Sequence, residues 1–145
     1  MNDYREIEVV IDPEMIFRSV MAEYALISAG KSDEEMPMQY ARCDMPGICS
    51  VLTMEELGVL CSHLSGYVES CDERDGGLVA IVVRIPKSLA AAAEASVRRR
   101  IEDYLVASVL SRCLVAVKVS QREYASLTSR PRASLRSLRQ LLSRF

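Results

Sequence analysis

The stretch LVAIVVRI at residues 78–85, followed by Pro86 and by SLAAAAEASVRRRIEDYLVASVLSRCLVAV at residues 88–117, decides the fold of this chain. The first part is a nearly continuous apolar run, which predicts a strand that is covered on both faces. Pro86 ends this strand because proline cannot donate a hydrogen bond to a neighbouring strand. The second part begins with the capping residue Ser88 and has apolar residues at helical spacing without glycine or proline. It predicts a helix of about thirty residues, ~45 Å long.

Two further elements precede this stretch. Residues 5–11 alternate between apolar and polar side chains, which is typical of a short, half-buried strand. Asp12 and Pro13 then have the sequence of a helix start, with a capping carboxylate followed by proline in the first turn. Apolar residues recur at helical spacing as far as Gly30, and we expect a helix from residue 13 to residue 29.

The segment from residue 31 to residue 50 lacks periodicity and contains Pro37 and Pro46, which predicts a long loop. A loop of this length is often functional, so one interpretation is a contact with a partner. The alternative is a loop folded over the core by its methionines. Thr53 and Glu56 then form a capping box. The helix that follows has one apolar stripe, which consists of Leu57, Leu60, Cys61, Leu64, Val68 and Cys71.

The C-terminal part of the chain predicts two shorter helices. Ser120 and Glu123 form a second capping box, and we expect the helix that it begins to be interrupted at Pro131. A final short helix is expected from Ser134. Its leucines share one side and arginines surround them, so residues 130–145 form an amphipathic and basic tail. This tail either lies on the domain or inserts into a partner.

These elements predict a mainly α fold with a small two-stranded β element, in the α+β class. We expect a helical bundle with a long central helix, edged by a ribbon of two strands that needs helix packing for its stability. Residues 1–129 would form a single domain, and residues 130–145 a basic tail that docks to a partner. The longest apolar runs are too short to span a bilayer, and the first residues show no signal-peptide pattern.

Charge divides the chain into two unlike halves. Residues 1–75 hold five basic and sixteen acidic side chains, a net charge of −11, whereas residues 76–145 hold thirteen basic and four acidic ones, a net charge of +9. Such asymmetry favours a head-to-tail partner or a polyanion at the basic end. The alternative is that the two halves neutralise each other within one fold.

The motifs of common enzymes and cofactor sites are not found in the sequence. It contains no phosphate-binding glycine loop, no zinc-protease motif and no serine-hydrolase elbow. The five cysteines are an odd number and favour reduced thiols in a cytosolic setting. Cys49, Cys61, His63 and Cys71 are zinc-type ligands but include no C-x2-C pair. We therefore expect no metal, no cofactor and no catalytic residue.

The order of elements after residue 77 resembles small structural proteins of tailed phages and prophages of Bacteroidales bacteria, the head–tail connector or neck proteins. The matching elements are the apolar strand at residues 79–85, the long helix that carries Arg100, Tyr104 and Arg112, and the basic tail at residues 130–144. The chain departs from that pattern in the proline within its last helix and in its serine-rich tail. The resemblance implies a non-enzymatic subunit of a homo-oligomeric ring between portal and tail.

On that basis we expect a virion protein, assembled in the host bacterial cytoplasm, which contacts portal or tail proteins. Double-stranded DNA would pass nearby without sequence-specific contact, and no membrane contact is expected. Two alternatives remain: a tail-completion or tail-terminator protein, or a small intracellular regulator that binds nucleic acid through its arginines. The residues expected to bind a partner are Arg130, Arg132, Arg136, Leu138, Arg139, Leu142, Arg144 and Phe145.

Overall fold

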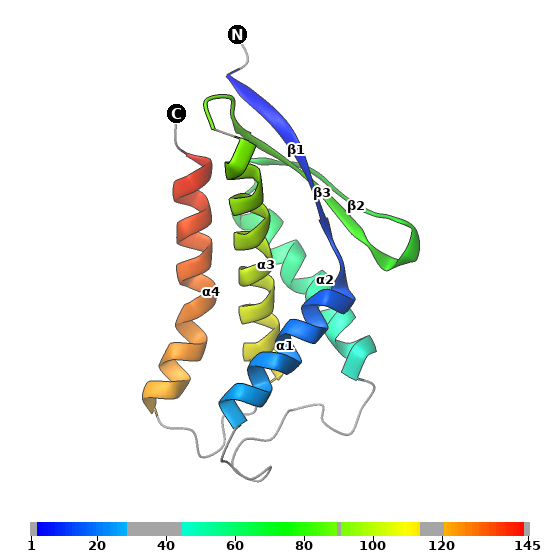
Figure 1. Cartoon of the computed structure of the whole chain (residues 1–145), viewed down its shortest axis with the longest axis vertical. Coiled ribbons are helices and arrows are strands. Elements are labelled where there is room, and N and C mark those ends of the chain that lie inside the picture. The colour runs from blue at the N-terminus through cyan, green and yellow to red at the C-terminus, as the bar shows by residue number, and fades with distance from the viewer. Residues whose placement is uncertain (1–2, 29–44, 90, 114–120, 144–145) are drawn as a thin grey trace.

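The computed structural model describes residues 3–28, 45–89, 91–113 and 121–143, which form four helices and a three-stranded antiparallel sheet (Figure 1). In chain order the elements are β1 (Tyr4–Ile11), α1 (Pro13–Ser28), α2 (Met45–His63), β2 (Val68–Glu73), β3 (Val79–Pro86), α3 (Ala91–Cys113) and α4 (Gln121–Leu142). The fold is α+β and mostly helical, as predicted. It has one strand more than the two that the sequence predicts.

The sheet has the strand order β1-β3-β2, with β3 at its centre. In β1, Ile7, Val9 and Ile11 are buried and the residues between them are exposed, which confirms the half-buried strand. Their partners on β3, which lie on the same face of the sheet, are Val83, Ile81 and Val79. One face of the sheet therefore packs on the helices.

The central strand β3 is covered less completely than its apolar sequence predicts. Its residues on the inner face are fully buried: Val79, Ile81, Val83 and Ile85. On the outer face, Val82 and Arg84 are only half-buried. Ala80 on the same face is only 1% exposed, so the prediction that the strand is covered on both faces is met in part on the outer one.

The strand β2 is the element that the sequence-based prediction missed. The predicted helical stripe continued through Val68 and Cys71, but α2 ends at His63 and both residues lie in β2. Their spacing suits a helix, yet the second edge of β3 carries N–H and C=O groups that need partners. Pairing of β2 along that edge, beginning with Val68 opposite Val83, supplies them.

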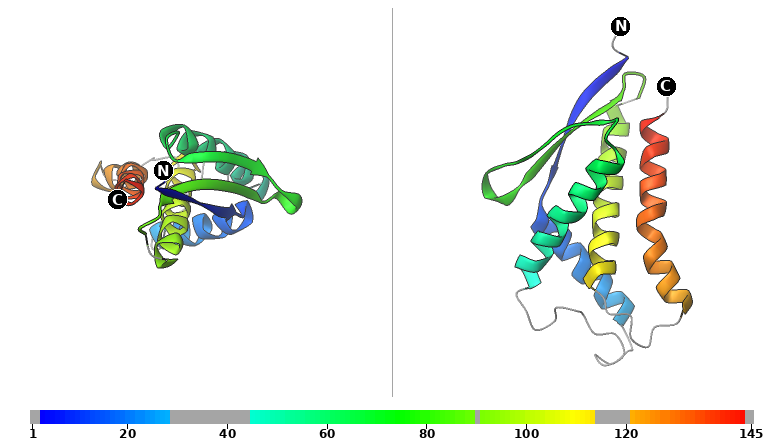
Figure 2. Two further views of the ribbon diagram at one scale, coloured as in Figure 1. Left: turned by 90° about the horizontal axis from the view of Figure 1, so that it is seen from above. Right: turned by 180° about the vertical axis from the view of Figure 1, so that it is seen from behind.

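The connection between β2 and β3 forms a hairpin. It contains a short 3-10 turn, Asp75–Gly77. Gly76 and Gly77 have φ angles of 77° and 78°, in the left-handed region that favours glycine. The N–H of Arg74 donates to the carbonyl oxygen of Leu78 at 2.7 Å and closes the turn. Figure 2 shows this hairpin on the side of the molecule that lies away from α4.

The helix α2 begins at Met45, well before the capping box predicted at Thr53. Thr53 is fully buried inside the helix, where its hydroxyl donates to the carbonyl oxygen of Cys49 at 2.6 Å. It does not cap a helix start, so the predicted capping box is wrong. Pro46 suits the first turn of the helix because the N–H groups there need no helical partner. The remainder of the predicted loop, residues 31–44, lies outside the described residues.

The helix α3 occupies the centre of the molecule, with α4 on one side of it and the sheet on the other (Figures 1 and 2). It spans 23 described residues, and residues 114–120 beyond it are not described, including the predicted cap at Ser120. The helix α4 continues through Pro131, so the predicted interruption and the separate helix from Ser134 are wrong. Proline removes one helical N–H, and the packing of α4 along α3 outweighs that loss.

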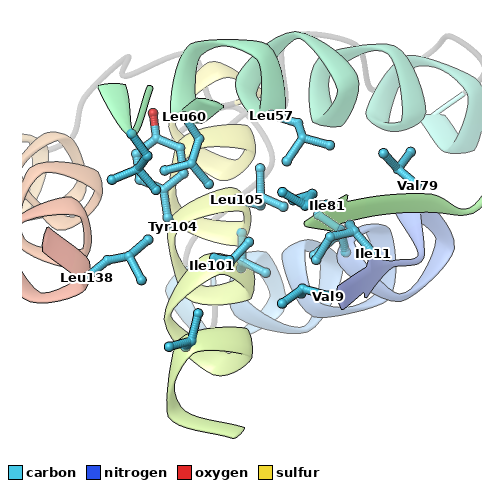
Figure 3. Packing of buried hydrophobic residues seen from close by; sticks show 14 of the residues in the cluster. Val9, Ile11, Leu57, Leu60, Val79, Ile81, Ile101, Tyr104, Leu105 and Leu138 are labelled. Atoms are coloured by element: carbon cyan, nitrogen blue, oxygen red, sulfur yellow. The ribbon is translucent and has the colours of Figure 1, made fainter. Parts of the chain in front are cut away.

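The hydrophobic core lies where α2, α3 and the sheet meet (Figure 3). Ile101 and Leu105 of α3 point toward Leu57 of α2 and toward the strands, and Leu138 approaches α3 from α4. All four side chains are at most 1% exposed. Because each buried Leu or Ile contributes roughly 1.5–3 kcal/mol, this shared core holds the helices and the sheet in one body.

Ion pairs join the acidic first half of the chain to its basic second half. They include Glu23–Arg130, Glu55–Arg112, Glu69–Arg84 and Arg5–Glu94. Each pair joins two different elements of the fold. The two halves therefore neutralise each other in part within one fold, as the alternative interpretation predicts. The arginines that have no acidic partner among the described residues are the candidates for binding another molecule.

Candidate functional site: an arginine-lined groove

Three arginines of α4 line an open groove with a volume of about 540 Å³. Arg132, Arg136 and Arg139 follow one another over about 10 Å of the helix, at 1.5 Å per residue. Among the described residues of the lining, Tyr67 comes from the turn between α2 and β2 and Ser143 directly follows α4, while the others lie on α4. The rest of the lining consists of Leu135, Gln140 and Ser143. None of these lining residues is acidic, so the groove is electropositive.

Arg139 is held in place by the end of α2. One of its Nη atoms donates to the carbonyl oxygen of His63 at 3.1 Å and lies 3.5 Å from Nδ1 of the same residue. The last carbonyls of a helix have no helical partner and carry partial negative charge, so a guanidinium group is favoured there. Arg139 thereby joins α4 to α2 and fixes one wall of the groove.

Arg132 and Arg136 are exposed, and neither pairs with an acidic side chain in the described ranges. Their guanidinium groups present forks of N–H donors that match the geometry of carboxylates and phosphates. Leu135 is half-buried and packs against the core, which gives the groove an apolar part. The two arginines are thus available to an anionic group that enters the groove.

The residues predicted to bind a partner are divided by the structure. Arg132, Arg136 and Arg139 lie together in the groove. Leu138 and Leu142 are 0% exposed in the core of this chain, so the prediction that they dock to a partner requires correction. The apolar face of the tail lies on the domain, which was one of the two alternatives. Of the three other predicted residues, Arg144 and Phe145 fall outside the described residues, and Arg130 is described next.

Arg130 also acts within the chain. Its two Nη atoms lie 2.5 and 3.1 Å from the two carboxylate oxygens of Glu23 on α1. The hydrogen bonds to Glu23 raise the pKa of the Arg130 guanidinium, which keeps its charge at any pH at which the protein folds. The guanidinium of Arg130 ties α4 to α1, so it is less available to a partner than Arg132 and Arg136 are.

The sequence-based prediction did not include Tyr67 in the site. This residue follows the last turn of α2, and its position beside α4 depends on where α2 ends and β2 begins. That boundary was predicted wrongly, because the helical stripe was extended into β2. Gln140 lies on the same helix as the predicted arginines and Ser143 directly follows it. Helical spacing from Arg136 and Arg139 is the signal that identifies both.

Two thiols outside the groove come together across the boundary between α2 and β2. Cys61 of α2 and Cys71 of β2 lie close enough for each thiol to affect the pKa of the other. Burial raises the pKa of the Cys61 thiol to about 12 and also raises the pKa of the Cys71 thiol. Both thiols are therefore protonated at neutral pH, and a protonated thiol is neither a good nucleophile nor a good metal ligand.

The other zinc-type residues do not join this pair of thiols. Cys49 is buried within α2, and His63 contacts Arg139. In the part of the chain that the structure describes, no three His, Cys, Asp or Glu side chains are placed to hold a metal ion. Over the same residues, none of the helices is both long and apolar enough to cross a membrane.

The chemistry that the groove offers is electrostatic. Guanidinium groups stay charged at neutral pH and do not transfer protons. The Ser143 hydroxyl donates to the carbonyl oxygen of Gln140, and no described base lies beside it to activate it as a nucleophile. The arrangement suits the binding of carboxylates or phosphates rather than covalent catalysis.

Comparisons with protein families, with curated proteins and with solved structures give no match to this chain. The geometry of the groove and the distribution of charge over the fold are therefore the basis on which a function is assigned.

Proposed function

We propose that this protein is a non-enzymatic structural subunit, a head–tail connector or neck protein of a tailed phage, which assembles as a ring between portal and tail. The resemblance of residues 78–145 to such proteins supports this function. The arginine groove supports it as well, because it offers binding without catalytic chemistry. The observation that carries the proposal is the placement of opposite charges on two distant sides of the fold.

The two charged surfaces are the arginine groove and the β2–β3 hairpin. Asp72, Glu73 and Asp75 are exposed on the hairpin, and none of them pairs with a basic side chain among the described residues. We call these three residues the acidic hairpin. Arg74, which lies among them, pairs with Glu8 of β1 at 3.1 Å. Both views of Figure 2 show α4 and the hairpin on opposite sides of the molecule.

A subunit with two unlike faces on opposite sides makes head-to-tail contacts, which close into a ring when the rotation between copies allows it. Opposite charges on the two faces set the orientation of the subunits and speed their association. In a virion, such a ring would contact portal and tail proteins and pass double-stranded DNA without sequence-specific contacts. A tail-completion or tail-terminator protein would form a similar ring with different neighbours, which co-purification with virion proteins distinguishes.

One observation favours a second function. Arg132 and Arg136 have no acidic partner in the described ranges, and a small regulator would use such arginines to contact the phosphates of nucleic acid. Binding of this kind weakens steeply with salt because counterions are released from the nucleic acid. The two functions differ in the state of the purified protein, since the regulator needs no ring.

The mass of the full chain in solution tests the proposed function, measured by light scattering and accompanied by electron microscopy of negatively stained particles. We expect a closed ring at about 0.05 M salt that dissociates at about 1 M, where the Debye length falls to ~3 Å. Removal of residues 130–145 is unsuitable as a comparison, because it takes Leu138 and Leu142 out of the core. The matched variant is Arg132→Gln with Arg136→Gln.

The double variant should give smaller particles than the unaltered chain under the same conditions. A chain that stays monomeric over the whole range of salt and protein concentration contradicts the ring. If that monomer binds duplex DNA and the double variant loses the binding, the groove belongs to a nucleic-acid regulator instead.

A further inference from the structure

The arginine groove and the acidic hairpin differ in charge and lie on opposite sides of the fold. We propose that the acidic hairpin of a second copy of this chain binds in the arginine groove, so that each subunit contacts the next through these two surfaces. The inference rests on the proposed ring and specifies the contact that builds it.

The charges of the two surfaces match in number. The groove holds three arginines and, within the described lining, no acidic residue. The acidic hairpin holds three carboxylates, while the positive charge of Arg74 is directed to Glu8. A carboxylate accepts two parallel hydrogen bonds from one guanidinium group, which gives such contacts both strength and a defined geometry.

The hairpin has the shape of an inserting element. Every residue from Cys71 to Gly77 is exposed. Gly76 and Gly77 at its tip carry no side chains, and a Cβ atom built at either position would meet no atom within 4 Å. The backbone of the tip can therefore approach another surface closely. On the groove side, the Tyr67 hydroxyl can donate to a carboxylate or to an exposed backbone carbonyl.

The geometry of the fold excludes this contact within one chain. In both views of Figure 2 the hairpin lies on the opposite side of the molecule from α4, and the main contacts of α4 are with α3. The groove and the hairpin can therefore meet only between copies. Such a contact is head to tail: each subunit binds one neighbour through its groove and the other neighbour through its hairpin, as a ring requires.

A reciprocal exchange of charge tests the contact. The groove variant is Arg132→Glu with Arg136→Glu, and the hairpin variant is Asp72→Arg with Asp75→Arg. Arg139 is left unchanged because it holds the end of α2. Sedimentation velocity at low salt measures the size of each species, and circular dichroism verifies that each variant folds.

Each variant alone should lose assembly, because the exchange brings like charges together at every contact. An equimolar mixture should regain it. In the mixture, the acidic groove of the groove variant binds the basic hairpin of the hairpin variant. The unaltered groove of the hairpin variant binds the unaltered hairpin of the groove variant. The restored particles should contain the two variants in alternation and in equal amounts.

The control variant is Arg98→Glu with Arg99→Glu. Both residues are exposed on α3 and lie outside the groove, and the change in net charge equals that of the groove variant. This control should assemble like the unaltered chain. Loss of assembly in the control as well would attribute the effect to net charge and overturn the specific contact.

The other outcomes separate this inference from the proposed function. If the unaltered chain forms rings and both charge-exchanged variants also form them, the ring stands and the contact between groove and hairpin is wrong. If the variants lose assembly and the mixture does not regain it, something other than the hairpin occupies the groove. If the unaltered chain never assembles, the ring itself fails and this contact fails with it.

Discussion

The two faces of α4 differ in what they contact. On one face, Leu138, Leu141 and Leu142 are at most 7% exposed and belong to the core. On the other face, Arg132 and Arg136 are exposed and have no acidic partner in the described part of the chain. The same 22-residue helix thus gives its apolar face to the fold and its basic face to the surface.

This difference separates what stabilises the protein from what it can recognise. Burial contributes roughly 1.5–3 kcal/mol for each leucine, whereas exposed charges contribute little to stability. Changes on the leucine face should therefore act on folding, and changes on the arginine face should act on binding. Arg130 lies between the two extremes, because it is partly exposed and paired with Glu23.

Leu138→Ala should have the largest effect on stability. Leu138 is fully buried where α4 packs on α3 (Figure 3), so its truncation leaves a cavity. We expect the free energy of unfolding to fall by about 2–5 kcal/mol, as measured by urea denaturation followed by circular dichroism. Leu135→Ala on the same helix is the matched control and should cost less, because Leu135 is only half-buried. A smaller loss for Leu138→Ala than for the control would place Leu138 outside the core.

Arg130→Gln should have a smaller effect. It removes a two-point ion pair between α4 and α1 whose side chains are 39% and 33% exposed. Solvent screens such a pair, so the expected loss is about 1 kcal/mol or less. A double-mutant cycle with Glu23→Gln measures the coupling. If the losses of the two single variants simply add in the double variant, the pair contributes nothing and Arg130 is as free as the arginines of the groove.

Elements that carry a clear local signal in the sequence were predicted correctly. The start of α1 is confirmed, because the Asp12 carboxylate accepts the N–H of Glu14 at 3.0 Å, as a helix cap does. The alternation in residues 5–11 likewise identified β1. Each of these signals lies within a few residues of the structure that it specifies.

The elements that were missed depend on contacts between distant residues. In β2, Val68 and Cys71 are spaced as in a helix, and only the free edge of β3 selects a strand. The groove has the same origin, since Arg139 reaches His63, which is 76 residues away in the chain. The residues of the tail could be identified from the sequence, but their division could not: leucines to the core, Arg130 to an ion pair, and Arg132 and Arg136 to the surface. That division depends on which face of α4 meets α3.

Arg132→Gln with Arg136→Gln should have the smallest effect on stability and the clearest effect on assembly. Neither side chain has an acidic partner among the described residues, so we expect the free energy of unfolding to change by no more than about 0.5 kcal/mol. The same urea denaturation measures it, with Leu138→Ala as the reference for a residue that the fold needs. A stable variant that no longer assembles would show that the arginine face acts on recognition alone. A loss of stability comparable to that of Leu138→Ala would instead make these arginines part of the fold, and the two faces of α4 would no longer have separate roles.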